Sequence, residues 1–178
     1  MLLVTIMLGS ILLAMAPAAA SRAKTYNVQR DPLDVASGDL DCDGDNDLVT
    51  ASDMGMFISI LYNENGDFSD RQDVWISNNQ TRRAGFFDIA DASAVEIGDI
   101  DGDNNPDIIF FQANIRVVGG NTVMGNLTVL YGNCEGDWTP STSITVSPYM
   151  IDIRVEDMDG DGNDDIIGLF IDSTIINM

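Results

Sequence analysis

Aspartates at alternate positions of three short segments are the residues of this chain best suited to chemistry. The segments span residues 39–47, 99–107 and 157–165, and each has aspartate at its positions 1, 3, 5 and 9 and an apolar residue at position 2. Ca²⁺ is a hard cation that takes about six to eight oxygen ligands. Carboxylates at alternate positions of a tight loop can turn towards one centre, so the shared spacing predicts three calcium-binding loops.

The expected ligands are the four aspartate side chains of each loop and the backbone carbonyl at position 7. They are Asp39, Asp41, Asp43, Asp47 and the Asp45 carbonyl; Asp99, Asp101, Asp103, Asp107 and the Asn105 carbonyl; and Asp157, Asp159, Asp161, Asp165 and the Asn163 carbonyl. Glycine or asparagine inside each loop permits the backbone conformations that such a turn requires. We expect Asp164 to face solvent. The position-2 residues are expected to point into the core; they are Leu40, Ile100 and Met158.

An EF-hand, a magnesium site and a plain acidic turn each fit these aspartates less well than a calcium loop between strands. An EF-hand needs a glutamate at position 12 and a helix on either side, whereas position 12 is Thr50, Phe110 or Gly168 and the flanks show no helical period. Magnesium demands a stricter octahedral geometry and retains more water, which favours calcium. Tight hairpin turns or a solvated acidic surface would account for the charge, but not for the shared register of three copies.

The composition of the chain argues against several classes of binding partner and of functional site. The 178 residues suffice for about one domain. Eight basic residues against 29 acidic ones give a net charge of −21, which argues against nucleic acid and anionic membrane surfaces as partners. The chain has no histidine, so the commonest general base and the usual zinc or copper ligand are missing. Two cysteines, Cys42 and Cys134, are too few for a disulfide scaffold, and the sequence leaves open whether they form one disulfide or remain free thiols.

The first 20 residues have the pattern of a secretory signal peptide. An apolar run ends in Pro17 and three alanines, which predicts cleavage after Ala20. No lysine or arginine precedes the run, so an uncleaved membrane anchor is the alternative. We therefore expect a secreted or cell-surface protein with no stable membrane span after cleavage. Extracellular calcium is abundant enough to fill weak sites.

The remainder of the chain alternates short β-rich segments with turns. After a polar lead-in at residues 21–30, strands are expected at residues 33–37, 48–51, 56–62, 73–77, 94–97, 108–111, 126–131, 143–146, 150–155 and 166–171. Residues 63–67 contain an Asn-Gly turn signal, and the Gly- and Asn-rich residues 112–125 are expected to be an inserted loop. The aspartate loops begin 60 and 58 residues apart. A period of this size with about four strands per unit is typical of a propeller or another β-array.

Together with the Asn-Gly-Asp-Phe turn at residues 65–68, the three loops resemble FG-GAP/VCBS repeats, the calcium-loop blades of integrin α-subunit propellers and of many exported microbial proteins. The resemblance covers residues 31–178. It implies an all-β fold of β-propeller-type blades with four antiparallel strands, in which the calcium loop joins the first two strands. The Phe-Gly…Gly-Ala-Pro motif is not clearly present, so the match is closer to the VCBS variant. About two and a half blades are expected, an incomplete propeller, since propellers close with about four to eight. Further blades or other chains would complete it.

These observations predict a secreted calcium-binding repeat module with about three structural ions and no catalysis. Recognition of an extracellular protein or glycan would lie on other loops, such as residues 78–92 and 112–125, and a stalk or adhesin segment fits the same pattern. The alternative is the propeller part of an extracellular lyase or hydrolase that acts on polysaccharides, because two carboxylates can serve as acid and base. Arg82 and Arg83 could then bind an acidic sugar, although a solvated pair is the simpler interpretation.

Overall fold

The computed structural model describes residues 24–52, 57–75, 88–117, 121–140 and 143–171. The expected signal peptide and the Arg82-Arg83 pair lie outside these residues. The described residues form strands and turns, and none of them belongs to a helix that could cross a membrane. The strands are β1 (Pro32–Gly38), β2 (Asp47–Ser52), β3 (Phe57–Glu64), β4 (Asp67–Trp75), β5 (Asp88–Gly98), β6 (Asp107–Val117), β7 (Asn121–Tyr131), β8 (Thr139–Pro140), β9 (Ile144–Val146), β10 (Met150–Glu156) and β11 (Asp165–Phe170).

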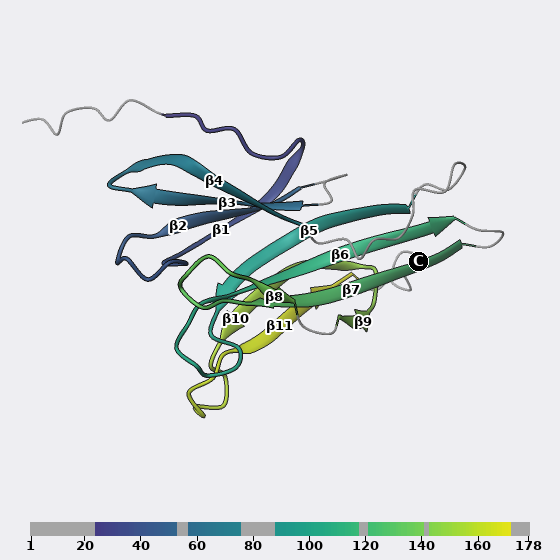
Figure 1. Ribbon diagram of the computed structural model, residues 1–178. Coiled ribbons are helices and arrows are strands. Elements are labelled where there is room, and N and C mark those ends of the chain that lie inside the picture. Colours follow the sequence, from purple (N-terminus) through teal and green to yellow (C-terminus); the bar gives the residue numbers. More distant parts are fainter. Residues whose placement is uncertain (1–23, 53–56, 76–87, 118–120, 141–142, 172–178) are drawn as a thin grey trace, which may run out of the picture.

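These strands form three antiparallel sheets, which we call the first, second and third units. The first unit has the order β1-β2-β3-β4, the second β5-β6-β7-β8 with β9 also on β7, and the third β10-β11. In Figure 1 the second unit lies between the other two, and β5 contacts β1, β2 and β10. The described residues therefore confirm the predicted all-β fold of antiparallel blades in an open arrangement.

Strands β4, β5, β6 and β7 extend well beyond the segments expected from the sequence. Asn65 and Gly66 have φ values of 54° and 84°, the positive values that a two-residue hairpin turn requires, so β4 begins at residue 67 and not at 73. Residues 112–125 were expected to be a loop. Their described part instead extends the β6–β7 hairpin, in which Gln112 pairs with Asn126 and Val117 with Asn121. Residues 88–92 likewise belong to β5 and not to a loop.

The core consists of two layers, one on each face of the second unit. Alternate side chains of a strand point to opposite faces, and β6 uses both. Ile108 and Phe110 pack towards the first unit, whereas Ile109 and Phe111 pack towards the third. All four are at most 1% exposed. The central sheet is thus held by burial of apolar side chains on both sides, which is the main favourable term in folding.

Glycines just before the loops let neighbouring units approach closely. A Cβ on Gly38 would lie 2.9 Å from Cγ2 of Ile97 in the second unit. A Cβ on Gly98 would clash with Val155 of the third unit and lie 2.7 Å from Oδ2 of Asp164. The two glycines occupy equivalent positions, directly before position 1 of their loops.

We expect Gly98→Ala to lower the free energy of unfolding by about 1–3 kcal/mol, the usual cost of overpacking. Gly38→Ala should cost less, because its new methyl group meets only the Ile97 side chain, which can move. Urea denaturation of both variants measures the difference. An equal or larger loss in Gly38→Ala would contradict the packing described for the third unit.

Candidate metal-binding loops

Each aspartate-rich segment forms the connection between the first two strands of its unit. The loops follow β1, β5 and β10 and lead into β2, β6 and β11. The strand pairs end in the same register, since Gly38 faces Asp47, Gly98 faces Asp107 and Glu156 faces Asp165. The three loops are therefore equivalent in structure as well as in sequence.

The backbone of every loop turns through two residues in the left-handed region. These residues stand at positions 4 and 6 and are Cys42 (φ 61°), Gly44 (98°), Gly102 (75°), Asn104 (64°), Gly160 (80°) and Gly162 (95°). Glycine adopts such angles without steric cost, and asparagine tolerates them better than most residues. This explains why glycine or asparagine recurs at these two positions, and it leaves Cys42 as the exception.

The first aspartate of each loop accepts hydrogen bonds across the loop. The N–H at position 6 donates to an Oδ2 atom in all three, from Gly44 to Asp39 at 3.0 Å, from Asn104 to Asp99 at 2.8 Å and from Gly162 to Asp157 at 3.0 Å. The carboxylate at position 5 accepts from the N–H at position 7, at 2.8 Å in each loop. These bonds hold the loop closed around the carboxylate at position 1.

The aspartate at position 9 connects its loop to the third strand. Asp47 is 1% exposed, and its Oδ2 accepts from the N–H of Leu40 at 2.8 Å while its Oδ1 accepts from the N–H of Asn63 at 2.7 Å. Asp107 does the same with Ile100 at 2.9 Å and Gly132 at 3.0 Å. Sequence reasoning assigned Asp47 and Asp107 only as metal ligands. The repeated Leu-Tyr pair that precedes both Asn63 and Gly132 is the sequence feature that accompanies this contact.

Burial raises the pKa of Asp47 and of Asp107 above the ordinary value of 3.8. The two backbone N–H groups at each carboxylate act in the opposite direction, and neighbouring loop aspartates raise the pKa further. In contrast, hydrogen bonds from the backbone and side chain of Asn105 lower the pKa of Asp103. In the first two loops, position 9 is therefore where a proton or a cation is most favoured over a bare negative charge.

Three carboxylates in each loop bring oxygen atoms within 4.8 Å of one another. The groups are Asp39, Asp41 and Asp43; Asp99, Asp101 and Asp107; and Asp157, Asp159 and Asp165. The predicted ligands that are not members of these groups are Asp45, Asp47, Asp103, Asn105, Asp161 and Asn163. Oxygen-only sets suit a hard divalent cation. Oδ1 of Asp39 fits such an ion, because it is buried and has no hydrogen-bond partner among the described residues.

The second and third loops are hydrogen-bonded to each other. The N–H of Asp164 donates to the carbonyl of Asp99, and the N–H of Asp99 donates to Oδ2 of Asp164, both at 2.9 Å. The expectation that Asp164 faces solvent was therefore wrong. Sequence position could not show this contact, because it forms only when the two units stack.

The apolar residues at position 2 differ in burial. Leu40 is fully buried and Ile100 packs into the layer between the second and third units, as expected. Met158 is 63% exposed, so its expected burial was wrong. Leu40 and Ile100 are covered by the unit that follows their own, and no described residue covers Met158 in that way.

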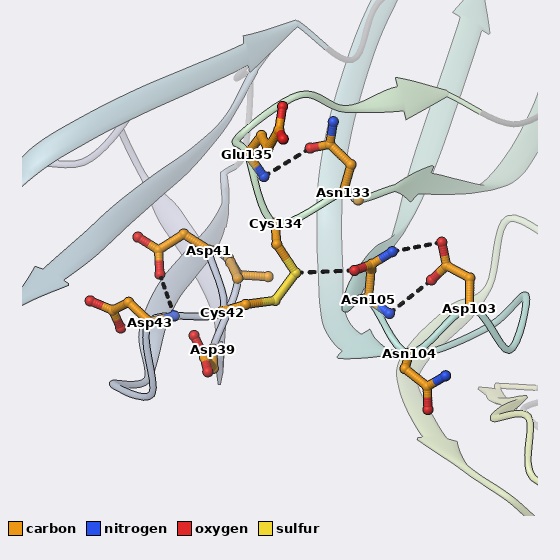
Figure 2. Close-up of a disulfide and its surroundings, with 12 residues drawn as sticks. Asp39, Asp41, Cys42, Asp43, Asp103, Asn104, Asn105, Asn133, Cys134 and Glu135 are labelled. Carbon is orange, nitrogen blue, oxygen red and sulfur yellow. Dashed lines mark hydrogen bonds between the residues drawn. A yellow bond between two sulfur atoms is a disulfide. The ribbon is translucent and has the colours of Figure 1, made fainter.

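A disulfide joins the first loop to the second unit, which settles the question that the sequence left open. Figure 2 shows Cys42 at position 4 of the loop bonded to Cys134, which lies between β7 and β8, with a Cα–Cα distance of 5.3 Å. The sulfur of Cys134 lies 3.1 Å from Oδ1 of Asn105, whose side-chain amide donates to Oδ2 of Asp103 at 2.7 Å. The bridge thus contacts the second loop as well as the first.

The first two loops lie in a part of the chain that matches a known protein family. A family model described as an FG-GAP-like repeat matches residues 39–110. The match begins at position 1 of the first loop and includes the whole of the second. Among curated proteins, none matches this chain. The third loop lies outside the match but repeats the hydrogen bonds and the backbone angles of the first two.

Loss of the disulfide should destabilise the protein. It closes a loop with a sequence separation of 92 residues, for which the chain-entropy model gives about 3–5 kcal/mol. We expect a reducing agent to lower the melting temperature of the wild-type protein. The Cys42→Ser/Cys134→Ser variant should melt at the lower temperature with or without reductant. A wild-type melting temperature that reductant leaves unchanged would show that the bond does not constrain the unfolded chain.

The raised pKa values predict how stability depends on pH when metal is absent. The folded protein binds protons at Asp47 and Asp107 more tightly than the unfolded chain does, so the free energy of unfolding should fall as the pH rises from 3.8 through their folded-state pKa. Urea denaturation at a series of pH values in metal-free buffer measures this. The Asp47→Asn/Asp107→Asn variant should show a weaker dependence over the same window, and a wild-type stability that rises there would contradict the assignment.

Proposed function

We propose, from the premise that residues 39–110 form an FG-GAP-like repeat, that this protein is a calcium-stabilised repeat module that binds an extracellular protein or glycan and has no catalytic activity of its own. The ions would occupy the three aspartate loops and hold the first two strands of each unit in place. Binding of the partner would use other surfaces of the units.

The observation that carries this proposal is that each of the three equivalent loops brings three carboxylates together, those at positions 1 and 3 in every loop with the one at position 5 or 9. Each group offers oxygen atoms within 4.8 Å of one another, at the same end of its sheet and on the same backbone turn. Carboxylates this close repel one another in the absence of a cation. Calcium suits them better than magnesium because it accepts a flexible arrangement of about six to eight oxygen ligands.

A structural role for the ions is supported by the hydrogen bonds of the loop carboxylates. Asp39, Asp43 and Asp47 each accept at least one N–H of the backbone. Groups held in this way keep the loop in shape. They are less available to transfer protons to a substrate, which favours an interaction module over the lyase or hydrolase alternative.

The disulfide supports secretion or display at the cell surface. Such bonds persist in oxidising compartments and are rare in the cytosol. Cys42 and Cys134 therefore agree with the signal-peptide pattern of residues 1–20, although they are an independent feature of the chain.

Calcium should raise the melting temperature of the purified protein, and excess EDTA should reverse the rise. A site that binds only the folded state adds about 2.7 kcal/mol when free calcium is 100 times its dissociation constant. We expect equilibrium dialysis to find about three ions per chain. Magnesium at the same concentration should stabilise the protein less.

Matched variants distinguish calcium binding in the loops from nonspecific screening of the negative surface charge by calcium. Asp39→Asn/Asp41→Asn removes two carboxylates of the first loop, and Asp70→Asn/Asp137→Asn removes two exposed carboxylates outside the loops. The first variant should bind about one ion fewer, and the second should bind as the wild type does. Equal loss of binding in both would refute the assignment of the first loop.

A further inference from the structure

Asp99 of the second loop is bonded through its backbone to a single residue of the third loop. The N–H of Asp164 donates to the carbonyl of Asp99, and the N–H of Asp99 donates to Oδ2 of Asp164, both at 2.9 Å. The two bonds form a closed pair between the loops. Asp99 therefore cannot shift relative to the third loop unless both bonds break.

The bonded residues lie next to the carboxylates that are proposed to bind calcium. Asp99 is itself a member of the second carboxylate group, and its two oxygens accept the N–H groups of Gly102 and Asn104 across the loop. Asp164 directly precedes Asp165, a member of the third group. An ion in either loop would therefore fix a residue that is a ligand, or is adjacent to a ligand, and that contacts the other loop.

A second contact joins the same two loops. A Cβ on Gly102 would clash with Oδ1 of Asn163, so the Asn163 side chain lies directly against the backbone at position 4 of the second loop. The carbonyl of Asn163 is one of the expected ligands of the third loop. Position 4 of one loop thus contacts position 7 of the next, where a carbonyl ligand is expected.

The same two positions meet at the other junction through the disulfide. Cys42 at position 4 of the first loop is bonded to Cys134, whose sulfur lies 3.1 Å from Oδ1 of Asn105 at position 7 of the second loop. Pro106 occupies the position of Asp164 and has no N–H to donate. The first junction therefore has a covalent link, whereas the second and third loops are joined by hydrogen bonds that can tighten or loosen with the loops.

We propose that calcium binding in the second and third loops is cooperative and that Asp164 is the positioning residue that couples them. This inference rests on the proposed calcium binding. An ion in the third loop orders Asn163, Asp164 and Asp165, and the bonds of Asp164 extend this order to Asp99. The second loop then loses less conformational entropy when it binds its own ion. Coupling between two binding sites is reciprocal, so each ion raises the affinity of the other loop.

Repulsion between the two ions acts against this coupling. The second loop has four aspartates and the third has five, so each loop keeps a net negative charge after it binds one divalent ion. Exposed charges are largely screened beyond about 8 Å at an ionic strength of about 0.15 M. Under those conditions we expect the direct contact at Asp164 to outweigh the repulsion.

Two substitutions of residue 164 separate the hydrogen bond from the charge. Asp164→Asn and Asp164→Ala lose the same negative charge, but asparagine keeps an oxygen that can accept the N–H of Asp99, and alanine has none. Both are made in a full-length chain that also has Asp39→Asn/Asp41→Asn, so that calcium fills only the second and third loops.

NMR titration of these chains at constant ionic strength follows the second loop through the N–H signal of Gly102. Asp157→Asn/Asp159→Asn removes two carboxylates of the third loop and should raise the free calcium concentration at which the second loop is half-occupied. We expect this increase to be at least about fivefold larger in Asp164→Asn than in Asp164→Ala. Asn46→Ala, at the position of Asp164 in the first loop, is the matched control and should give the increase seen in the chain that retains Asp164.

The outcomes distinguish this inference from the proposed function. Calcium binding at Gly102 and Gly160 with equal increases in Asp164→Asn and Asp164→Ala would overturn the coupling and leave the calcium sites intact. Signals of both glycines that do not respond to calcium would overturn the proposed function and the coupling with it.

A second arm leaves residue 164 unchanged. When Asp101→Asn/Asp103→Asn is added to the chain without first-loop carboxylates, calcium should fill only the third loop. Hydrogen exchange of the Asp99 N–H should still slow by about fivefold or more on addition of calcium, because its acceptor belongs to the third loop. The N–H of Asp45, which bonds within the first loop, should not change. Unchanged exchange at Asp99 would overturn the coupling even if Asp164→Ala does not fold.

Discussion

A buried carboxylate that accepts two backbone N–H groups is the interaction on which the first two units depend. Asp47 joins the start of its loop to the end of β3, and Asp107 joins its loop to the segment after β7. Burying a charge without partners is costly, and the two hydrogen bonds offset part of that cost. Each carboxylate therefore links the loop, the second strand and the third strand, so that none of them can shift independently of the others.

Stacking of the units brings the acidic loops close together. β6 directs alternate side chains to two apolar layers, and the glycines before the loops allow the neighbouring sheets to approach. Two local links then connect the loops, the disulfide of Cys42 and Cys134 and the hydrogen bonds between Asp99 and Asp164. Much of the net charge of −21 is therefore concentrated at one end of the sheets, where a cation lowers the repulsion most.

Strands were predicted well where the hydrophobic pattern and the turn residues of a short segment were enough to define them. The segments expected at residues 48–51 and 150–155 differ from β2 and β10 by one or two residues at their ends. The loop prediction failed for the described part of residues 112–125, because polar residues and glycines can form strands once a partner strand is present. The start of β4 was also predicted too late in the chain. The two-residue turn before residue 67 allows β4 to pair with β3 from that residue onward.

The sequence by itself determined the repeating loop, the spacing of its carboxylates and the residues at its left-handed positions, because these depend on contacts within about ten residues. Only the tertiary structure decided that Asp47 and Asp107 are buried, that Cys42 pairs with Cys134 and that Asp164 bonds to the neighbouring loop. These contacts join residues that are distant in sequence. The hydrogen bonds of Asp47 and Asp107 form when the third strand pairs within each unit. The disulfide and the bonds of Asp164 form only when β-sheets of separate units stack, and no local pattern encodes which surfaces will meet.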